Sequence, residues 1–329
     1  GRDVAVQYPA ITSNQMSQQT THALLMVRPS QFRSNEQTAQ DNYFQHQDVD
    51  ESNNLLELAQ REFDNFVALL REHGVQVVVV QADQEKDTPD AHFPNNWIST
   101  HPDRRIAIYP MKAPNRREER PDSVLEAIEA AGFFIEEVYD YSEAALDGIF
   151  LEGTGSMVLD HPHQKAYAAL SQRTNEDLFI EFCEDFEYTP VVFTASQTVG
   201  GQLIPIYHTN VMLCVGSQVA VICSSAIKDS KERKNVWQHL KSDGLQIIDI
   251  TEAQMHQFAG NMLEVRGTHG PLMVMSQSAL KSLTPNQVRI IEESCVIVAP
   301  DLTTIETYGG GSARCMLAEI FLPQSMRIA

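Results

Sequence analysis

The sequence has no long apolar run, no closely spaced pair of cysteines and few basic side chains compared with acidic ones. A membrane-spanning helix needs about 18 or more consecutive apolar residues, and no stretch of this chain approaches that length. The first residues, Gly1 to Val4, lack the basic and then apolar layout of a secretion signal. We therefore expect a cytoplasmic protein without a membrane partner.

The cysteines and the charge exclude further classes. The five cysteines are odd in number and widely spread, with no Cys-x-x-Cys motif to indicate a zinc site or dithiol redox chemistry. At least one thiol must therefore be free. The formal net charge of −20 repels nucleic acid, so no nucleic-acid partner is expected, and its field attracts cationic or zwitterionic small molecules.

Strand and helix patterns alternate along most of the chain. Residues 1–22 are largely polar and aperiodic, which predicts a loose N-terminal arm, and residues 23–329 then form a single α/β domain that holds the site. Thr284 is the expected N-cap of the last helix, and residues 315–321 close the chain as an extended segment. The predicted strands and helices, unit by unit, cover residues 23–27, 53–72 and 75–80; 106–109, 123–131 and 133–138; 157–159, 176–186 and 191–193; 211–215, 219–223, 228–240 and 245–250; and 272–275, 285–293 and 296–298.

One polar residue stands just ahead of an apolar strand, or within its first turn, in each of five units. These residues are Asn96, Glu152, His208, Asn261 and Cys315, at intervals of 56, 56, 53 and 54 residues. A period of this size is close to that of propeller-like and solenoid repeats. If the units surround a pseudo-fivefold axis, one pocket collects a carboxylate, an imidazole and a thiol. Repetition for packing alone is the alternative.

Cys315 follows three glycines, at positions 309–311. Glycine permits backbone torsions and a close approach that other residues do not, so this loop can wrap against a substrate. We interpret Cys315 as a nucleophile that attacks the trigonal carbon of a guanidino or ureido group. The other cysteines lie in or beside apolar runs or on an amphipathic helix, and they are interpreted as inert buried thiols.

His208 and Glu152 supply the remaining chemistry. His208 stands at the start of an apolar strand, and an imidazole can act as base for the thiol and as acid for the leaving amine near neutral pH. Glu152 lies between apolar residues and a glycine-rich turn, where a buried carboxylate needs a partner such as the N–H groups of a substrate. A structural histidine and a solvated acid are the alternatives.

The combination resembles the guanidino-group modifying, or pentein, superfamily, which includes arginine deiminases, dimethylarginine dimethylaminohydrolases, agmatine deiminases, succinylarginine dihydrolase and amidinotransferases. The resemblance covers residues 23–321, and its motifs are Phe-Pro-Asn-Asn-Trp at 93–97, Leu-Glu-Gly at 151–153, His-Thr-Asn at 208–210 and Gly-Gly-Gly to Cys at 309–315. It implies an α/β fold of the five-bladed, pseudo-symmetric propeller type. It also implies Cys315 as nucleophile, His208 as acid and base, Glu152 as ligand of the substrate nitrogens, and neither a metal nor an organic cofactor.

Two departures from the superfamily pattern bear on the substrate. Many members carry Asp where this chain has Asn96, and His-x-Asp where it has Asn210. A cationic guanidinium is best held by carboxylates, whereas a neutral ureido group has a carbonyl oxygen that wants a donor such as an asparagine amide. The substitution at Asn96 therefore favours citrulline over arginine. The motifs at 93–97 and 309–315 resemble those of the bacterial citrulline utilization hydrolases.

The expected reaction is the hydrolysis of citrulline to ornithine, ammonia and carbon dioxide. A Cys315 thiolate, favoured by a protonated His208, forms a thiocarbamoyl-type intermediate. Arg28 and Arg314 are candidates to hold the α-carboxylate of the substrate. The other candidate substrate-binding residues are Asn95, Asn96, Asn210 and Asn261.

Two alternatives remain open. An arginine-directed deiminase, a dimethylargininase-like hydrolase or an amidinotransferase would use the same three catalytic residues. A non-catalytic propeller that only binds a partner belongs to another class, and it would be expected to lack the nucleophile and the base. The oligomeric state is also open, with a homo-oligomer as one alternative.

Overall fold

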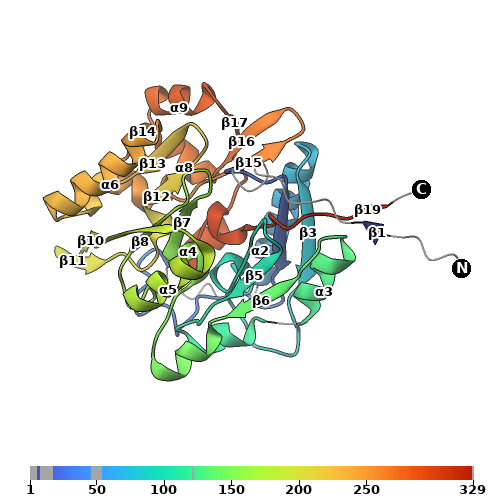
Figure 1. Ribbon diagram of the computed structural model, residues 1–329. Helices are drawn as coiled ribbons and strands as arrows, with labels where there is room; N and C mark the ends of the chain where they lie inside the picture. Colours follow the sequence, from blue (N-terminus) through green and yellow to red (C-terminus); the bar gives the residue numbers. More distant parts are fainter. Residues whose placement is uncertain (1–5, 8–17, 46–53, 121, 328–329) are drawn as a thin grey trace, which may run out of the picture.

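Five three-stranded sheets form the framework of the protein (Figure 1). The computed structural model describes residues 6–7, 18–45, 54–120 and 122–327. In each sheet the first strand is antiparallel to the second, and the third is parallel to the second. The sheets consist of β18 (Ala318–Glu319), β2 (Ala23–Arg28) and β3 (Gln76–Gln81); β4 (Ile98–Thr100), β5 (Arg105–Ile108) and β6 (Glu137–Asp140); β7 (Met157–Asp160), β8 (Lys165–Ala169) and β9 (Thr189–Phe193); β12 (Leu213–Val215), β13 (Val219–Ile222) and β14 (Gln246–Asp249); and β15 (Leu263–Gly267), β16 (Gly270–Val274) and β17 (Val296–Val298).

A helical crossover joins the second and third strands of every sheet, because a tight turn cannot join parallel neighbours. The crossover helices are α2 (Leu55–Glu72), α3 (Asp122–Ala130), α5 (Glu176–Phe186), α6 (Ser230–Ser242), and the pair α8 (Gln277–Ser282) and α9 (Pro285–Glu292). In α5, Asn175 caps the first turn by accepting a hydrogen bond from the Leu178 N–H, while Phe179 and Phe182 are fully buried. Within the described residues, no helix combines the length and apolar character that crossing a membrane requires.

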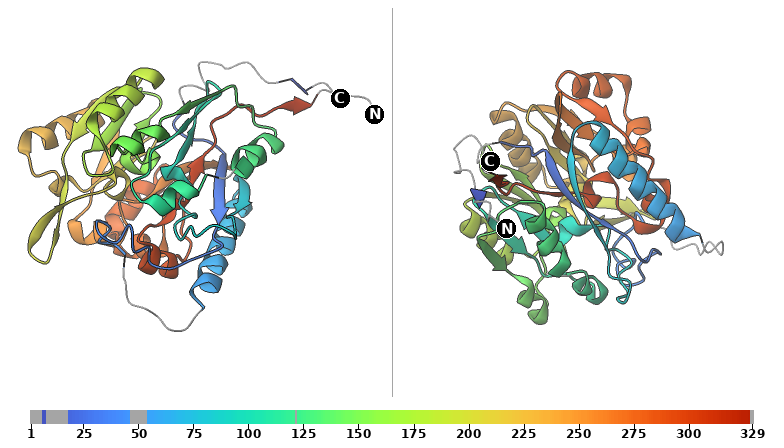
Figure 2. Two further views of the ribbon diagram at one scale, coloured as in Figure 1. Left: turned by 90° about the horizontal axis from the view of Figure 1, so that it is seen from below. Right: turned by 90° about the vertical axis from the view of Figure 1, so that its right-hand side faces the viewer.

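Short helical turns lead into the first strands of the sheets. The 3₁₀ turn η1 (Pro94–Asn96) precedes β4, and the short helix α4 (Gly153–Ser156) precedes β7. The 3₁₀ turns η4 (Thr209–Val211) and η7 (Ala313–Met316) precede β12 and β18. The hairpin of β10 (Ser196–Val199) and β11 (Gln202–Pro205) projects from the body of the molecule (Figure 1). In both views of Figure 2, α2 lies at the edge of the molecule. These remaining elements are α4 (Gly153–Ser156), α7 (Glu252–His256), β10 (Ser196–Val199), β11 (Gln202–Pro205), the paired β1 (Val6–Gln7) and β19 (Met326–Arg327), the π-helical turn η6 (Ile305–Gly309), and the 3₁₀ turns η1 (Pro94–Asn96), η2 (Pro114–Glu118), η3 (Ser142–Asp147), η4 (Thr209–Val211), η5 (Ser224–Ala226) and η7 (Ala313–Met316).

Several predicted elements are confirmed. The helix over 176–186 and the strand over 296–298 have the predicted bounds, and Thr284 caps α9 by accepting a hydrogen bond from the Gln287 N–H. The prediction omitted β4, β8 and β15, so the second, third and fifth units contain three strands rather than the two predicted. The five cysteines are all free thiols, as their odd number required of at least one.

The strand predicted over residues 133–138 is wrong. β6 begins only at Glu137, because the backbone before it pairs with the C-terminal segment. Phe133 forms an isolated bridge with Gln324, and the Phe134 N–H donates to the Pro323 carbonyl at 3.0 Å. Apolar residues that pack under a remote segment therefore look like a strand in the sequence.

The N-terminal arm predicted over residues 1–22 lies mostly outside the described residues. Gln19 is described, and its side-chain amide donates to the carbonyl oxygens of Leu159 and Val215, both at 2.9 Å. The chain is therefore bonded to two other sheets before β2 begins.

Candidate active site

The structure brings the repeated polar residues together. Each stands immediately before, or within, the short segment that leads into the first strand of its sheet. All five are buried, from Asn261 at 0% exposure to Cys315 at 8%. Nε2 of His208 lies 2.7 Å from Oε1 of Glu152, and Nδ2 of Asn261 lies 3.4 Å from Sγ of Cys315. A carboxylate, an imidazole and a thiol that are distant in sequence thus share one site.

Gly155 lets two of these turns pack closely. A Cβ added at Gly155 would lie 2.5 Å from Nδ2 of Asn96 and 2.9 Å from Nδ1 of His208. Because real Cβ atoms do not approach other atoms so closely, any larger residue would push Asn96 and His208 away. Glycine at this position therefore joins Asn96 to the Glu152–His208 pair.

Both carboxylate oxygens of Glu152 are bound by the protein. Oε1 accepts the hydrogen bond from His208 and lies 3.5 Å from Nη1 of Arg173, and Oε2 accepts from the Lys112 N–H at 2.9 Å. Burial by itself would raise the pKa of Glu152, but the charge of Arg173 and the His208 hydrogen bond hold that pKa at about 2. Glu152 is therefore an ionised partner that orients His208. The sequence had predicted instead that Glu152 binds the nitrogen atoms of the substrate.

Cys315 and His208 are both neutral in this arrangement. Burial raises the pKa of the Cys315 thiol, and burial lowers the pKa of His208 although Glu152 opposes this. Hydrogen-bond partners of Sγ include Asn261, Nδ2 of Asn210 at 3.9 Å and the backbone of Ser312. Burial thus favours the neutral form of both groups, and the amide N–H groups of Asn261 and Asn210 are in place to stabilise a thiolate once it forms.

The orientation of the Asn96 amide follows from its neighbours. Nη1 of Arg116 donates to Oδ1 of Asn96 at 2.6 Å, and since arginine only donates, this contact fixes the oxygen. Nδ2 of Asn96 donates one hydrogen to Oδ1 of Asn95 at 3.0 Å and lies toward Gly155. Nδ2 of Asn95 and Oδ1 of Asn210 are buried and have no hydrogen-bond partner. The site therefore offers asparagine donors and one asparagine acceptor to a ligand.

Three charged residues of the site were not found by the sequence analysis. Arg116 and Glu119 form a fully buried ion pair with a shortest distance of 2.9 Å, and burial raises the pKa of Glu119 to about 7 even against Arg116. They lie in a run of charged residues, which is typical of a solvated surface. Asp90 is also buried, with Oδ2 bound to Nδ2 of Asn35 at 2.9 Å and Oδ1 without a partner. Only the tertiary contacts distinguish these residues from surface charges.

Arg28 and Arg314 do not hold the position that was predicted for them. Arg28 forms an ion pair at 2.9 Å with Asp64 on α2, where both side chains are substantially exposed. The Arg314 guanidinium donates to the Leu317 carbonyl at 2.7 Å and to Glu319 at 3.1 Å. A substrate carboxylate would therefore have to compete with Asp64 for Arg28 and with Glu319 for Arg314.

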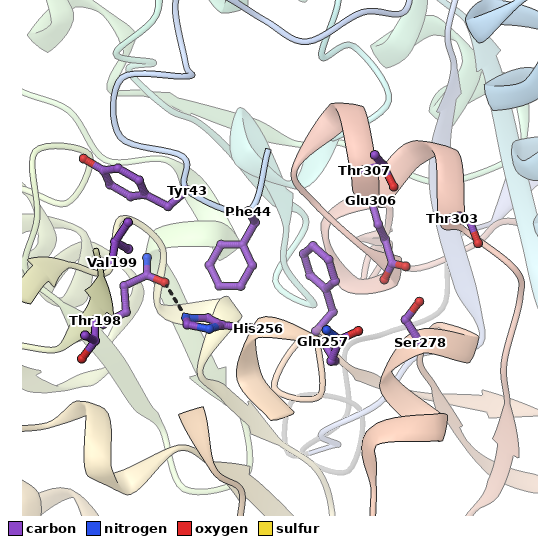
Figure 3. Close-up of a pocket in the computed structure, with 12 residues that line it drawn as sticks. Tyr43, Phe44, Thr198, Val199, His256, Gln257, Ser278, Thr303, Glu306 and Thr307 are labelled. Atoms are coloured by element: carbon purple, nitrogen blue, oxygen red, sulfur yellow. Dashed lines mark hydrogen bonds between the residues drawn. The ribbon is translucent and has the colours of Figure 1, made fainter. Parts of the chain in front are cut away.

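Residues 29–45, which we call the covering segment, run from the end of β2 across the site. Nδ2 of Asn42 donates to the Gly310 carbonyl at 3.3 Å, and the ring of Phe44 packs against that of Tyr207. On the other side of Phe44 is a cavity of about 430 Å³. In Figure 3, Phe44 stands between His256 and the helical turn that carries Glu306. Phe44 of the covering segment thus lines this cavity and also contacts Tyr207, the neighbour of His208.

One group of side chains has the composition of a metal site. Ligand atoms of Asp160, His163 and Asp243 lie within 4.8 Å of one another among the described residues. Asp160 is bonded to His163, and Oδ2 of Asp243 is bonded to Nζ of Lys165 at 2.8 Å. These partners account for the charges, and the group lies outside the catalytic site.

The fold and the site together define a mixed α/β protein of the pentein type, with a buried cysteine, histidine and glutamate. Residues 28–322 match the family model described as N,N dimethylarginine dimethylhydrolase, eukaryotic. The chain belongs to this family. It is therefore an enzyme, a cysteine-dependent hydrolase of arginine-related amidino groups, and the non-catalytic alternative is excluded. No curated protein sequence matches the chain.

Solved structures share the fold at low sequence identity. The arginine dihydrolase ArgZ from the ornithine–ammonia cycle in cyanobacteria, in its apo form, has a TM-score of 0.69 and 17% identity over 90% of this chain and 40% of ArgZ. Its substrate-bound N-terminal domain has the same TM-score and identity over 91% of this chain and 99% of the domain. A dimethylarginine dimethylaminohydrolase adduct with S-methyl-L-thiocitrulline has a TM-score of 0.61 and 13% identity, over 90% and 98%. The chain thus spans two fifths of full-length ArgZ.

Proposed function

We propose that the protein hydrolyses the ureido group of citrulline completely, to ornithine, ammonia and carbon dioxide. The observation that carries the proposal is the orientation of Asn96. Arg116 holds its oxygen, so the amide presents N–H to the site. An N–H donor suits the carbonyl oxygen of a ureido group, whereas a guanidinium has only donors to offer. The partner of the protein is then a small amino acid, and no cofactor takes part.

The proposed chemistry uses three residues. His208 takes the proton of Cys315, and Sγ attacks the ureido carbon while the amides of Asn261 and Asn210 stabilise the negative sulfur. Protonation by His208 releases the ornithine amine and leaves an S-carbamoyl group on Cys315. Water activated by His208 then cleaves the C–S bond, and the carbamate formed breaks down to ammonia and carbon dioxide. Glu152 stabilises the imidazolium at both stages.

The amino-acid end of the substrate needs one acceptor and one cation. We assign the ammonium to Asp90, whose buried Oδ1 has no partner. We assign the carboxylate to the side chains of Arg173 and Lys112, two cations that bind one carboxylate, that of Asp41.

The fold proposed for this site is a five-bladed propeller over residues 23–329. Its support is contact between first strands of successive sheets, namely β18 with β4, β7 with β12, and β12 with β15. First strands side by side at the axis would explain why the turns before them converge. A location in the cytoplasm is proposed on the free thiols of all five cysteines.

The second candidate is complete hydrolysis of arginine. It is supported by the substrate-bound domain of the arginine dihydrolase, which shares the fold over 91% of this chain, and by the buried acid Asp90. Family membership also supports Nω,Nω-dimethylarginine as a substrate.

The test is an assay of ornithine, citrulline and ammonia released from citrulline, arginine and dimethylarginine. Ornithine from citrulline, at a kcat/KM at least tenfold above that for either guanidino compound, is the expected result. Ornithine and two ammonia from arginine, without turnover of free citrulline, would establish the second candidate instead.

Asn96→Asp tests the reason for the preference. Aspartate still accepts from Arg116, but it replaces the N–H donor by a carboxylate, so kcat/KM for citrulline is expected to fall about tenfold or more relative to that for arginine. Asn286→Asp on the exposed face of α9 is the matched control. An unchanged ratio in Asn96→Asp would contradict the role given to Asn96.

A further inference from the structure

The covering segment places a carboxylate among the cations of the site. Oδ2 of Asp41 accepts hydrogen bonds from Nε of Arg173 at 3.1 Å and from Nζ of Lys112 at 2.9 Å, and Oδ1 accepts from Nη2 of Arg173. The Arg173 side chain is 4% exposed and that of Asp41 is 19% exposed. This is the two-point geometry in which arginine binds a free carboxylate.

The Arg173–Lys112 pair lies one side chain away from the catalytic histidine. Both residues also contact Glu152, through Nη1 of Arg173 at 3.5 Å and the backbone N–H of Lys112 at 2.9 Å. The Arg173 guanidinium is held in place by the ring of Tyr207, 4.6 Å below it. A ligand carboxylate bound here would therefore lie in the same site as Glu152 and His208.

Arg116, the other buried arginine of the site, donates its hydrogen bonds to residues that line the site. Arg116 donates to Glu119 through Nε and Nη2, to Asn96 through Nη1 and to the Phe93 carbonyl through Nη2. Removing any of these partners would dismantle the site itself. In contrast, the carboxylate on the Arg173–Lys112 pair comes from a segment that crosses over the site.

Apart from Asp41, the covering segment is attached by exposed ion pairs and by hydrogen bonds of its uncharged groups, which include Asn35 to the buried Asp90 at 2.9 Å and the Thr38 carbonyl to Arg173 at 3.3 Å. Arg33 pairs with Asp87 where the two side chains are 39% and 64% exposed, and such surface pairs contribute little to stability. Asn42 makes a hydrogen bond of 3.3 Å to a backbone carbonyl. Phe44 borders the cavity of about 430 Å³, which leaves it room to move (Figure 3). Asp41 is therefore the ionic attachment that a ligand would have to replace.

We propose that Asp41 occupies the position of the substrate α-carboxylate on the Arg173–Lys112 pair, and that substrate binding exchanges one carboxylate for the other. This inference rests on the proposed function, in which the substrate is an amino acid. Asp41 is then a specificity-determining residue, because a ligand without a carboxylate cannot take over its hydrogen bonds. If Asp41 is seated in nine-tenths of the molecules, it raises the apparent dissociation constant of the substrate about tenfold.

The test compares ligands that differ in the carboxylate alone. Citrulline is paired with its decarboxylated analogue 4-ureidobutylamine, and arginine with agmatine. For each, the dissociation constant is measured on the full chain by protection of Cys315 from iodoacetamide, read by intact mass, together with KM and kcat where turnover occurs. The variants are Asp41→Asn, which removes the competing charge, Asp41→Glu, which keeps it, and Asp87→Asn, the matched control, which removes the exposed carboxylate paired with Arg33 of the covering segment.

Asp41→Asn is expected to tighten binding of the carboxylate-bearing member of a pair by about threefold to tenfold. It should not tighten binding of the member without a carboxylate, and Asp41→Glu and Asp87→Asn should resemble the unmodified protein. Equal changes for both members, or weaker binding of the carboxylate-bearing member with a lower kcat, would show that Asp41 merely positions Arg173, and would overturn the proposal. Circular dichroism and thermal unfolding verify that Asp41→Asn is folded, and Asp41→Ser, which also removes the competing charge, carries the comparison if it is not.

The two proposals fail in different ways. If arginine rather than citrulline is the substrate, the proposed function fails, but the carboxylate-specific effect of Asp41→Asn is still expected within the arginine and agmatine pair. If citrulline is hydrolysed and Asp41→Asn shows no carboxylate-specific effect, the proposed function stands and the exchange of carboxylates is refuted.

Discussion

Replacing Glu152 by Gln removes a charge from the centre of the site and changes its shape little. The carboxylate now accepts from Nε2 of His208 at 2.7 Å and from the Lys112 N–H at 2.9 Å, one donor on each oxygen. A glutamine amide has one oxygen and one NH₂ group, so its NH₂ would face one of these two donors. The substitution therefore breaks one buried hydrogen bond. It also removes the negative charge that balances the Arg173 guanidinium and the imidazolium of His208.

The magnitude follows from the pKa of Glu152, which lies at about 2 instead of the ordinary 4.5. At 1.36 kcal/mol per unit, the partners stabilise the ionised form by about 3 kcal/mol, and the side chain is buried enough for solvent screening to be small. Since the folded-state pKa is lowered, this stabilisation is present above about pH 4.5 and is lost as the pH falls toward 2. At neutral pH, Glu152→Gln should lower the free energy of unfolding by about 3 kcal/mol.

The same substitution should lower kcat about 10²-fold to 10⁴-fold, because the imidazolium that forms on His208 loses its counter-charge. The assays are chemical denaturation for stability and ornithine release for kcat. Glu293→Gln at the C-cap of α9, whose partner Arg289 is exposed, should change the unfolding free energy by less than about 0.5 kcal/mol. A Glu152→Gln protein that keeps more than a tenth of the kcat would refute the assignment of Glu152 as the partner of His208.

Two further predictions concern the nucleophile and the segment above it. Because burial raises the pKa of Cys315, its alkylation rate by iodoacetamide in the ligand-free protein should still rise with pH beyond the pH at which an ordinary thiol is half ionised. A midpoint of this pH profile below that value would contradict a neutral resting thiol. Gly310→Ala should destabilise the protein by about 1–3 kcal/mol more than Gly200→Ala: both glycines have positive φ, but an added Cβ at 310 would lie 2.5 Å from Nδ2 of Asn42, and at 200 it meets nothing within 4 Å. Thermal unfolding of the two variants measures the difference, and equal losses would show that backbone strain alone is responsible.

The repeated positions could be found in the sequence because they follow from local rules. Each polar residue precedes an apolar strand, and five similar units put those residues at nearly constant intervals. The helix over 176–186 was predictable for a similar reason, since apolar residues at helical spacing and an asparagine cap determine its bounds within one segment. These features need no knowledge of what lies across the fold.

The partners of the catalytic residues were not predictable in this way. Arg116 and Glu119 stand in a run of charged residues, and only folding buries them under Asn96. The protonation states of Cys315 and His208 also depend on burial, which the sequence does not state, and burial favours the neutral form of each.

By itself the sequence determined the alternation of strands and helices, the free thiols, and the candidates Cys315, His208 and Glu152, since these depend on residue type and on spacing along the chain. The tertiary structure alone decided which charges face one another: Glu152 against His208, Arg116 against Asn96, and Asp41 against a cation more than a hundred residues away. Electrostatic interactions act through space and depend on burial, so they are settled only when separate segments of the chain meet.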